Sequence, residues 1–146
     1  MQHTVWLPYS FSVGPVFNRF YEGLKEEKLW ANKCTRCNNV LVPPRSFCPA
    51  CNVEMEEWVE AAQQGDVVSW TVAGYDFYGM PAQPPFVGAL IRLDGTDCNF
   101  LHMVGGFAVT DFAGKKDRIQ KRTRVRAVWS EVKKGHMLDI RYFQPV

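Results

Sequence analysis

Near the start of the chain, apolar residues recur at the spacing of an α-helix. They fall at positions Val16, Phe17, Phe20, Tyr21 and Leu24. Charged residues complete an amphipathic pattern that predicts a helix over residues 15–28, with a proline in the first turn, where proline is favoured. A helix this short with an aromatic face is stable only when that face is packed. We therefore expect it to dock on the chain itself or on a partner.

From Gly65 onward, the pattern becomes that of β-strands. Five stretches rich in β-branched and aromatic residues are separated by turn residues, at positions 67–75, 86–93, 98–104, 123–132 and 137–143. The Asp94-Gly95 pair between the second and third stretches predicts a tight hairpin turn. A longer, charged connection over residues 112–121, either a loop or a short helix, precedes the fourth stretch. Five strands with these connections predict a small barrel of the OB type.

Two Cys-x-x-Cys pairs lie between the predicted helix and the predicted barrel. They are Cys34 with Cys37, and Cys48 with Cys51. Zn²⁺ binds thiolates well, and a spacing of two residues lets one backbone turn direct both sulfurs at one ion. Asn38 and Asn52 follow the pairs, where such a turn requires a positive φ that asparagine tolerates. The sequence therefore predicts a Cys₄ metal site.

The expected role of this site is structural. Four thiolates leave no coordination position open for water or substrate, so the ion folds the chain and performs no chemistry. Between the two pairs, residues 40–44 and 45–47 have room for two short strands. Zn²⁺ is the expected ion, and iron in a rubredoxin-like site is the alternative.

The fifth cysteine, Cys98, has no catalytic base beside it in the sequence pattern. His102 is four residues further along the same predicted strand, which places it about 13 Å away and out of hydrogen-bond range. A buried structural role is therefore the better interpretation of Cys98. Neither a Ser/His/Asp pattern, a phosphate-binding loop nor a pair of carboxylates stands out, so the sequence makes no case for a self-sufficient enzyme.

Composition narrows the class of protein further. Hydrophobic residues make up 47% and charged residues 22% of the chain, which are ordinary globular values. An odd number of cysteines, five, argues against a fully paired disulfide framework and favours reduced thiols in the cytoplasm. The charge-free stretch 77–91 contains three prolines and is unsuited to crossing a membrane. We expect a cytoplasmic protein without a membrane partner.

Charge is distributed unevenly along the chain. Residues 1–73 contain six Lys/Arg and eight Asp/Glu, a net charge of −2, whereas residues 74–146 contain eleven and seven, a net charge of +4. Most of the excess lies in residues 115–126, with seven basic residues and one acidic residue. This stretch is either a solvated loop and strand face or a binding surface for a nucleotide, a polyphosphate or an acidic protein.

Several short motifs accompany the order of helix, Cys₄ ribbon and barrel. They are the aromatic stretch 17–24, the first cysteine pair at 34–37, Pro43-Pro44-Arg45 leading into 47–51, the strand 65–71, Pro85-Phe86-Val87 with Leu93-Asp94, and Phe143-Gln144-Pro145. In this combination the chain resembles the acyl-CoA-associated zinc-ribbon/OB-fold proteins, long known only as a domain of unknown function. It departs from them at Asn38 and Asn52, where glycine is usual, and at Lys121-Arg122, where the family tends to have Ile-Gly.

The resemblance implies a helical segment over residues 1–30, a rubredoxin-like zinc ribbon over 31–56 and a five-stranded OB-fold over 57–146. It also implies a non-catalytic accessory subunit of a thiolase-type acyl-CoA complex. In such a hetero-oligomer the catalytic Cys and His belong to the thiolase chain. Aromatic-compound degradation is one compatible pathway.

In this reading, the basic residues bind the phosphates of coenzyme A, and the aromatic face of the helix docks on the partner. The candidate CoA-binding residues are Arg45, Lys115, Lys116, Lys121 and Arg122. Two alternatives remain. A stand-alone OB-fold protein with a structural zinc could bind single-stranded nucleic acid, although the near-neutral charge makes nucleic acid an unlikely partner. A rubredoxin-like electron carrier is the other.

Overall fold

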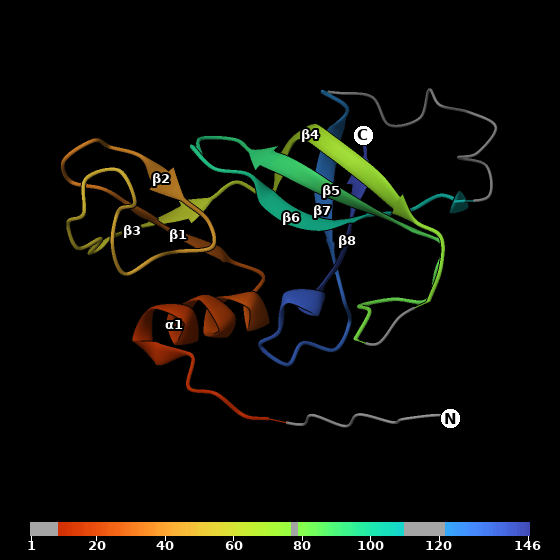
Figure 1. Ribbon diagram of the computed structural model, residues 1–146, viewed down its shortest axis with the longest axis horizontal. Coiled ribbons are helices and arrows are strands. Elements are labelled where there is room, and N and C mark those ends of the chain that lie inside the picture. The colour runs from red at the N-terminus through yellow and green to blue at the C-terminus, as the bar shows by residue number, and fades with distance from the viewer. Residues whose placement is uncertain (1–8, 77–78, 110–121) are drawn as a thin grey trace, which may run out of the picture.

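One helix, a three-stranded sheet and a closed five-stranded barrel follow one another along the computed structural model of the chain (Figure 1). The structure describes residues 9–76, 79–109 and 122–146. In Figure 1 the three-stranded sheet lies to the left of the barrel, and helix α1 (Gly14–Lys25) lies below. This arrangement confirms the predicted fold class. The charged connection 112–121 lies outside the described residues.

Helix α1 ends before residue 28, the predicted limit. Glu27 has a φ of 58°, and the backbone N–H of Lys28 donates to the carbonyl of Gly23 at 2.9 Å. The left-handed φ of Glu27 and the hydrogen bond from Lys28 to Gly23 together form a Schellman motif, which ends the helix. A side chain at Gly23 would meet the ring of Trp30 at 2.3 Å. Glycine therefore allows the helix to approach the following strand, and its buried neighbours on the same face are Phe20 and Leu24.

The three-stranded sheet consists of β1 (Leu29–Lys33), β2 (Val40–Leu41) and β3 (Glu57–Ala61), in the order β2-β1-β3. Both pairings are antiparallel. Strand β1 begins before residue 31 and β3 lies wholly beyond residue 56, so the sheet crosses both expected limits of the ribbon domain. The division of the chain at those two positions stays a proposal.

Residues 45–47 do not form the predicted second strand of the ribbon. The side chain of Asn32 occupies both backbone polar groups of Arg45: Oδ1 accepts from the Arg45 N–H at 3.1 Å, and Nδ2 donates to the Arg45 carbonyl. Only an isolated bridge between Phe47 and Glu54 forms in this region. The third strand of the sheet is instead β3, which pairs with β1 along its whole length.

The barrel contains five strands, as predicted, and closes in the order β4-β5-β6-β8-β7. They are β4 (Gln64–Ala73), β5 (Phe86–Leu93), β6 (Phe100–Val104), β7 (Arg124–Trp129) and β8 (Ile140–Pro145). All pairings are antiparallel except that of β6 with β8. Gly95, at a φ of 73°, makes the predicted hairpin turn between β5 and β6.

The last predicted strand begins later than residue 137, because a short 3₁₀ helix, η2 (Met137–Asp139), precedes it. The carboxylate of Asp139 accepts hydrogen bonds from the backbone N–H groups of Lys134, Gly135 and His136 at 2.7–3.1 Å. These bonds fold the chain back on itself. Strand β6 also begins later than predicted, because residues 98–99 belong to the preceding loop, which contacts β2.

One continuous hydrophobic core runs from the helix through β1 into the barrel. Its largest fully buried side chains are Phe20, Phe100, Phe143, Leu24, Leu29, Ile91, Leu93 and Ile140. Burying one such side chain contributes about 1.5–3 kcal/mol. The ribbon has a separate and much smaller core of Cys34, Leu41, Cys48 and Met55. The barrel can therefore rely on apolar packing, whereas the ribbon cannot.

Gln63, between β3 and β4, joins the helix, the ribbon and the barrel. Its Nε2 donates to the carbonyl of Glu27 at the end of α1. Its Oε1 accepts from Trp129 Nε1 at 2.9 Å, and its backbone carbonyl accepts from the Ala127 N–H at 2.8 Å.

Within the described ranges, no helix is both long and apolar enough to cross a membrane.

Candidate functional site

Four cysteine sulfurs converge at the end of the ribbon. The Sγ atoms of Cys34, Cys37, Cys48 and Cys51 all lie within 4.8 Å of one another. Those of Cys37 and Cys48 are 3.7 Å apart. A tetrahedral Zn²⁺ with Zn–S bonds of about 2.3 Å requires sulfur separations of about 3.8 Å. The cluster therefore has the donors and the dimensions of a Cys₄ metal site.

The two Cys-x-x-Cys turns share one backbone geometry. Asn38 has a φ of 61° and donates its N–H to the carbonyl of Cys34 at 2.9 Å. Asn52 has a φ of 53° and donates its N–H to the carbonyl of Cys48 at 2.8 Å. The predicted positive φ at both asparagines is confirmed. Each turn thereby directs two sulfurs to the same point.

The surroundings of the sulfurs favour a bound cation. Hydrogen bonding from the backbone of Cys37 lowers the pKa of Cys34 to about 7, because a donated proton stabilises a thiolate. A hydrogen bond shared with the Cys37 thiol, together with burial, raises the pKa of Cys51 to about 12. Four crowded sulfurs cannot all ionise without a compensating positive charge, which a divalent metal supplies. The donor set thus fits a metal ion and leaves no position for a substrate.

Cys98 and His102 have different partners. Cys98 Sγ lies 3.1 Å from the backbone nitrogen of Val42 and 3.2 Å from its carbonyl oxygen. His102 Nε2 lies 3.1 Å from the carbonyl oxygen of Met137. The thiol holds the ribbon against the barrel, and the imidazole holds η2 against β6. Cys98 is half-buried and not buried as predicted, but its contacts agree with a structural role.

The predicted CoA-binding residues are only partly described. Arg45 is exposed beside the ribbon, with its backbone held by Asn32. Arg122 is exposed before β7, has a φ of 74° and donates its N–H to the carbonyl of Val67 at 2.7 Å. These two residues belong to different units of the fold. The other candidates lie outside the described residues: Lys115, Lys116 and Lys121.

The aromatic face of α1 is largely used within the chain itself. Phe20 is fully buried, and Tyr21 packs partly against the core. Of the two expected docking surfaces, the chain itself covers Phe20 and part of Tyr21, and docking of the rest of the face on a partner stays a prediction. On α1 and the segment directly before it, the exposed aromatic side chains are Tyr9, Phe11 and Phe17, at 82%, 70% and 38% of their surface.

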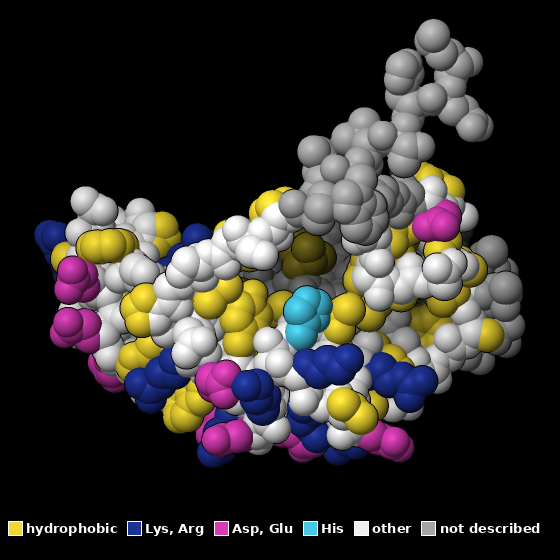
Figure 2. Space-filling view, turned by 90° about the horizontal axis from the view of Figure 1, so that it is seen from below, with side chains coloured by type: hydrophobic (Ala, Val, Ile, Leu, Met, Phe, Trp, Pro, Cys, Tyr) yellow, Lys and Arg dark blue, Asp and Glu magenta, His cyan; other side chains and the backbone are white. Residues whose placement is uncertain are grey.

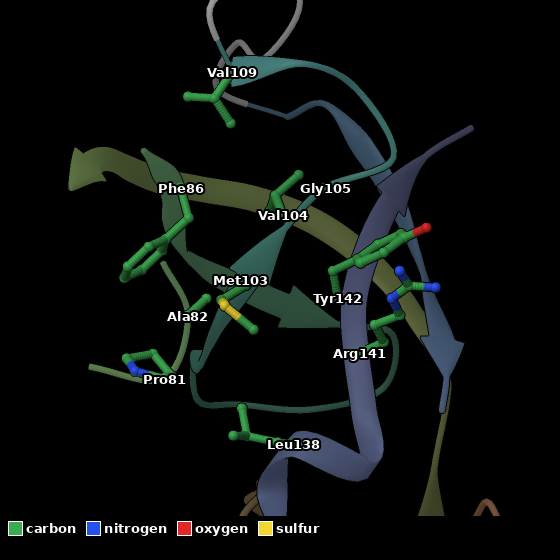
Figure 3. Close-up of a pocket in the computed structure, with 10 residues that line it drawn as sticks. All are labelled: Pro81, Ala82, Phe86, Met103, Val104, Gly105, Val109, Leu138, Arg141 and Tyr142. Atoms are coloured by element: carbon green, nitrogen blue, oxygen red, sulfur yellow. The ribbon is translucent and has the colours of Figure 1, made fainter. Parts of the chain in front are cut away.

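Sequence reasoning missed an apolar cleft on the barrel wall. Two cavities of 410 and 320 Å³ share Pro81, Phe86, Met103 and Leu138 as lining residues. We call the joined cavities the barrel cleft. Figure 3 shows Pro81, Phe86 and Met103 gathered on one side of the larger cavity and Arg141 on the β8 side. Seen from below, apolar side chains surround a hollow near the middle of the molecule, and charged side chains follow one edge (Figure 2).

A signal for this cleft was present in the sequence. Outward-facing positions of a barrel strand are ordinarily polar, yet β5 and β6 place Phe86, Leu90, Leu101 and Met103 there. The pattern alone could not show that the loop before β5 and the 3₁₀ helix before β8 would rise beside these positions and form walls.

Comparison with known proteins places this fold. The model of the ChsH2 rubredoxin-like zinc ribbon domain matches residues 22–55, and that of the ChsH2 C-terminal OB-fold domain matches residues 58–130. A probable enoyl-CoA hydratase alpha subunit from Thermomonospora curvata is 33% identical over 101 residues. The match covers 65% of this chain and 31% of that protein, so the chain spans about a third of the length of this relative.

Two solved structures have the same fold. One is described as an Ltp2-ChsH2(DUF35) aldolase, with a TM-score of 0.67 and 24% identity over 93% of this chain and 98% of that chain. The other is a DUF35-family protein of unknown function from Sulfolobus solfataricus, with a TM-score of 0.62 and 24% identity over 90% and 84%. The ribbon, the barrel and both family matches together show that this chain belongs to the ChsH2 family of zinc-ribbon/OB-fold proteins.

Proposed function

We propose that the chain is a non-catalytic accessory subunit of an acyl-CoA enzyme, and more specifically of a thiolase-type complex. Three exposed aromatic side chains carry this proposal: Tyr9, Phe11 and Phe17. Large aromatic residues are enriched at protein interfaces and supply much of their binding energy. The first two directly precede α1, and the third lies on it, where the buried face of the helix holds it in place. We assign this aromatic surface to the partner enzyme.

The names of the relatives support an enzyme partner. One is called an alpha subunit of an enoyl-CoA hydratase, and the other pairs ChsH2 with Ltp2 in an aldolase. Within the described part of the chain, the nucleophilic groups considered above are engaged in structural contacts. The cysteine cluster surrounds a closed site, and Cys98 contacts Val42. We accordingly assign the catalytic step to the partner chain, as expected for the accessory subunit of a thiolase.

The Cys₄ cluster is proposed to hold structural zinc. A colourless protein with one equivalent of zinc is the expected preparation. Four thiolates around iron absorb visible light, so a red protein would support the rubredoxin-like alternative instead. The CoA phosphates are proposed to contact Arg45, Lys115, Lys116, Lys121 and Arg122. Reversing the charge of the last four should weaken CoA binding by the complex, and an unchanged affinity would contradict this assignment.

Single-stranded nucleic acid is the weaker alternative. OB-folds bind single strands across the second and third barrel strands, with basic side chains along the backbone and aromatic side chains under the bases. In this chain the corresponding strands are β5 and β6. Their outward positions are mainly aliphatic, with Leu90 beside Leu101 and Gly88 beside Met103. Such a face offers few cations and little stacking surface.

The proposal is tested by isolating the tagged chain from its native host and identifying bound proteins. An acyl-CoA enzyme should be recovered, and Phe11→Asp with Phe17→Asp should reduce its recovery at least tenfold. Val146→Asp is the matched control, because Val146 is also exposed, at 72%, and lies at the C-terminus, well away from α1 (Figure 1). If no acyl-CoA enzyme is recovered, the proposal is wrong. If the recovered enzyme is not a thiolase, only the assignment to a thiolase-type complex is wrong.

A further inference from the structure

A groove opens between the first turn of α1 and the ribbon. Its apolar walls are Pro15 and Val16 on the helix, and the exposed Phe47 with the buried Met55 on the ribbon. We call it the helix–ribbon groove. Its cavity of 290 Å³ is at the lower limit of the range of roughly 300–1,000 Å³ that is usual for small-molecule sites. Because the Phe47 side chain is 52% exposed, the groove has the character of a protein contact surface.

Arg19 lies one helical turn beyond this groove. It is the neighbour of Pro15 and Val16 on the helix surface, since residues three and four apart lie side by side. Its Cζ lies over the ring of Trp58 at 4.3 Å and over that of Trp30 at 5.0 Å. Within the part of the chain that the structure describes, this exposed guanidinium has no ion-pair or hydrogen-bond partner. The two indoles therefore hold a cation whose N–H donors stay available.

Two carboxylates lie on the same surface. Glu54 and Glu56 line the groove and are exposed, and neither forms an ion pair with a described residue. Glu57, by contrast, lies 3.7 Å from Lys33. The groove thus carries an uncompensated cation beside it and two uncompensated carboxylates within it, which do not reach one another.

Such a surface is complementary to itself. A two-fold rotation brings the cation of one copy to the carboxylates of another, and the same contact then forms twice. We propose that the helix–ribbon groove is the interface of a two-fold symmetric dimer of this chain, in which Arg19 of each copy pairs with Glu54 and Glu56 of the other. The exposed Phe47 rings are buried between the copies, as aromatic anchors are in protein interfaces. A surface of one charge sign would leave either the cation or the carboxylates uncompensated.

This dimer goes beyond the proposed function and is compatible with it. Phe17 precedes Arg19 by two residues, which places it about 200° away around the helix axis. The ring of Phe17 therefore lies on the opposite flank of α1 from the groove and stays free for an enzyme partner.

The dimer is tested by sedimentation of the purified, metal-loaded full chain over a wide range of concentrations. The mass should rise from that of one chain to that of two. Arg19→Glu brings like charges together and should weaken the dimer at least tenfold, as should Glu54→Arg combined with Glu56→Arg. Arg36→Glu is the matched control, because Arg36 is an exposed arginine of the ribbon that forms no ion pair with a described residue and does not line the groove.

Mixing the two reversed variants gives the sharpest measurement. Each variant opposes like charges when it pairs with itself, but a pair made of one copy of each has opposite charges in both halves of the interface. The mixture should therefore form the dimer again, at close to the affinity of the unchanged chain. Recovery of binding also shows that both variants are folded, so that misfolding cannot explain the loss in either one alone.

Several results would overturn the proposal. These are a chain that stays monomeric at every concentration, masses beyond two chains, an equal loss in Arg36→Glu, or a mixture of the variants that stays monomeric. A monomeric chain whose Arg19→Glu variant no longer recovers the partner enzyme would assign the groove to that enzyme instead. The mass measurement needs no partner, so a monomer contradicts only the dimer, and failure to recover an acyl-CoA enzyme contradicts only the proposed function.

Discussion

Cys98 binds both backbone polar groups of Val42 through a single sulfur atom. The Sγ atom lies 3.1 Å from the Val42 nitrogen and 3.2 Å from its carbonyl oxygen. One residue earlier, the backbone N–H of Asp97 donates to the carbonyl of Val40 at 2.8 Å, and the Asp97 carboxylate accepts from the Val40 N–H. The hairpin loop between β5 and β6 thereby supplies hydrogen-bond partners to backbone groups at the outer edge of β2. The cysteine left over from the metal cluster is the one that joins ribbon to barrel.

Cys98→Ala should destabilise the chain by about 1–3 kcal/mol, because it leaves the partly buried N–H and carbonyl of Val42 without their partner. Cys98→Ser retains a hydroxyl that donates and accepts, and should cost less than the alanine variant. Urea unfolding of both variants measures the difference. Equal stability of the alanine variant and the unchanged chain would show that the sulfur contributes only volume.

Removal of the metal should unfold the cysteine-bearing end of the ribbon and leave the barrel folded. The small core around the cysteines contains only four buried residues, two of them cysteine ligands, whereas the main core joins β1 to the barrel and contains no metal ligand. After chelation, hydrogen exchange should become fast in β2 and in the two cysteine turns and stay slow in β5. Cys51→Ser should have the same effect, with Thr35→Ser, an exposed change within the first turn, as control. Loss of protection in β5 to the same extent would contradict this independence.

Asp139→Asn should destabilise η2 and the preceding loop by about 1–3 kcal/mol. Burial acts to raise the pKa of Asp139, but hydrogen bonds from the N–H groups of Lys134, His136 and Gly135 outweigh it and hold the pKa below its ordinary value. The contribution to stability is therefore complete above the unfolded pKa of about 3.9 and is lost as pH falls through the lower folded pKa.

Urea unfolding between pH 7 and pH 3 measures this dependence. The drop in unfolding free energy at low pH should be smaller in Asp139→Asn than in the unchanged chain. Glu131→Gln alters an exposed carboxylate nearby and serves as the control. An identical pH profile in the Asp139 variant would exclude a linked carboxylate at this position.

His102 should make the fold less stable as the solution becomes mildly acidic. Burial lowers the pKa of His102 below its ordinary value, although the hydrogen bond with the Met137 carbonyl opposes the shift. Below the unfolded pKa of about 6.5, the unfolded chain binds a proton that the folded chain resists, so stability falls with pH by at most about 1.4 kcal/mol per unit. NMR titration of the imidazole measures the folded pKa directly. A folded pKa at or above 6.5 would contradict the sign of this effect.

The sequence predicted the elements that depend on local pattern. Strand β5 coincides with its predicted range, and the helix, the hairpin at Gly95 and the five strands are present. Two of the errors lie where a side chain takes over backbone hydrogen bonds. Asn32 removes the expected strand at 45–47, and Asp139 turns the start of the last strand into η2. No periodicity carries that information, because the partners are separated in sequence or bonded through side chains.

The metal cluster was predictable to the residue, because spacing within each turn fixes two ligands and asparagine marks the required φ. The barrel cleft was not, since its walls come from four separate segments. The aromatic helix is intermediate between the predictable metal cluster and the unpredictable cleft. Its pattern identifies an apolar face but cannot say whether the chain itself or a partner covers that face. Only the packing shows that Phe20 is covered by the chain and that Phe17 stays partly exposed.

The hydrogen bonds of Gln63 have a consequence for recognition. Because this side chain spans from the end of α1 to Trp129 of β7, the helix cannot tilt independently of the barrel. The exposed ring of Phe17 on α1 and the cleft on the barrel are thus held at a constant separation. A partner that engages both must present matching features at that same spacing. Gln63 would then act as a geometric filter on which partners fit, without touching any of them.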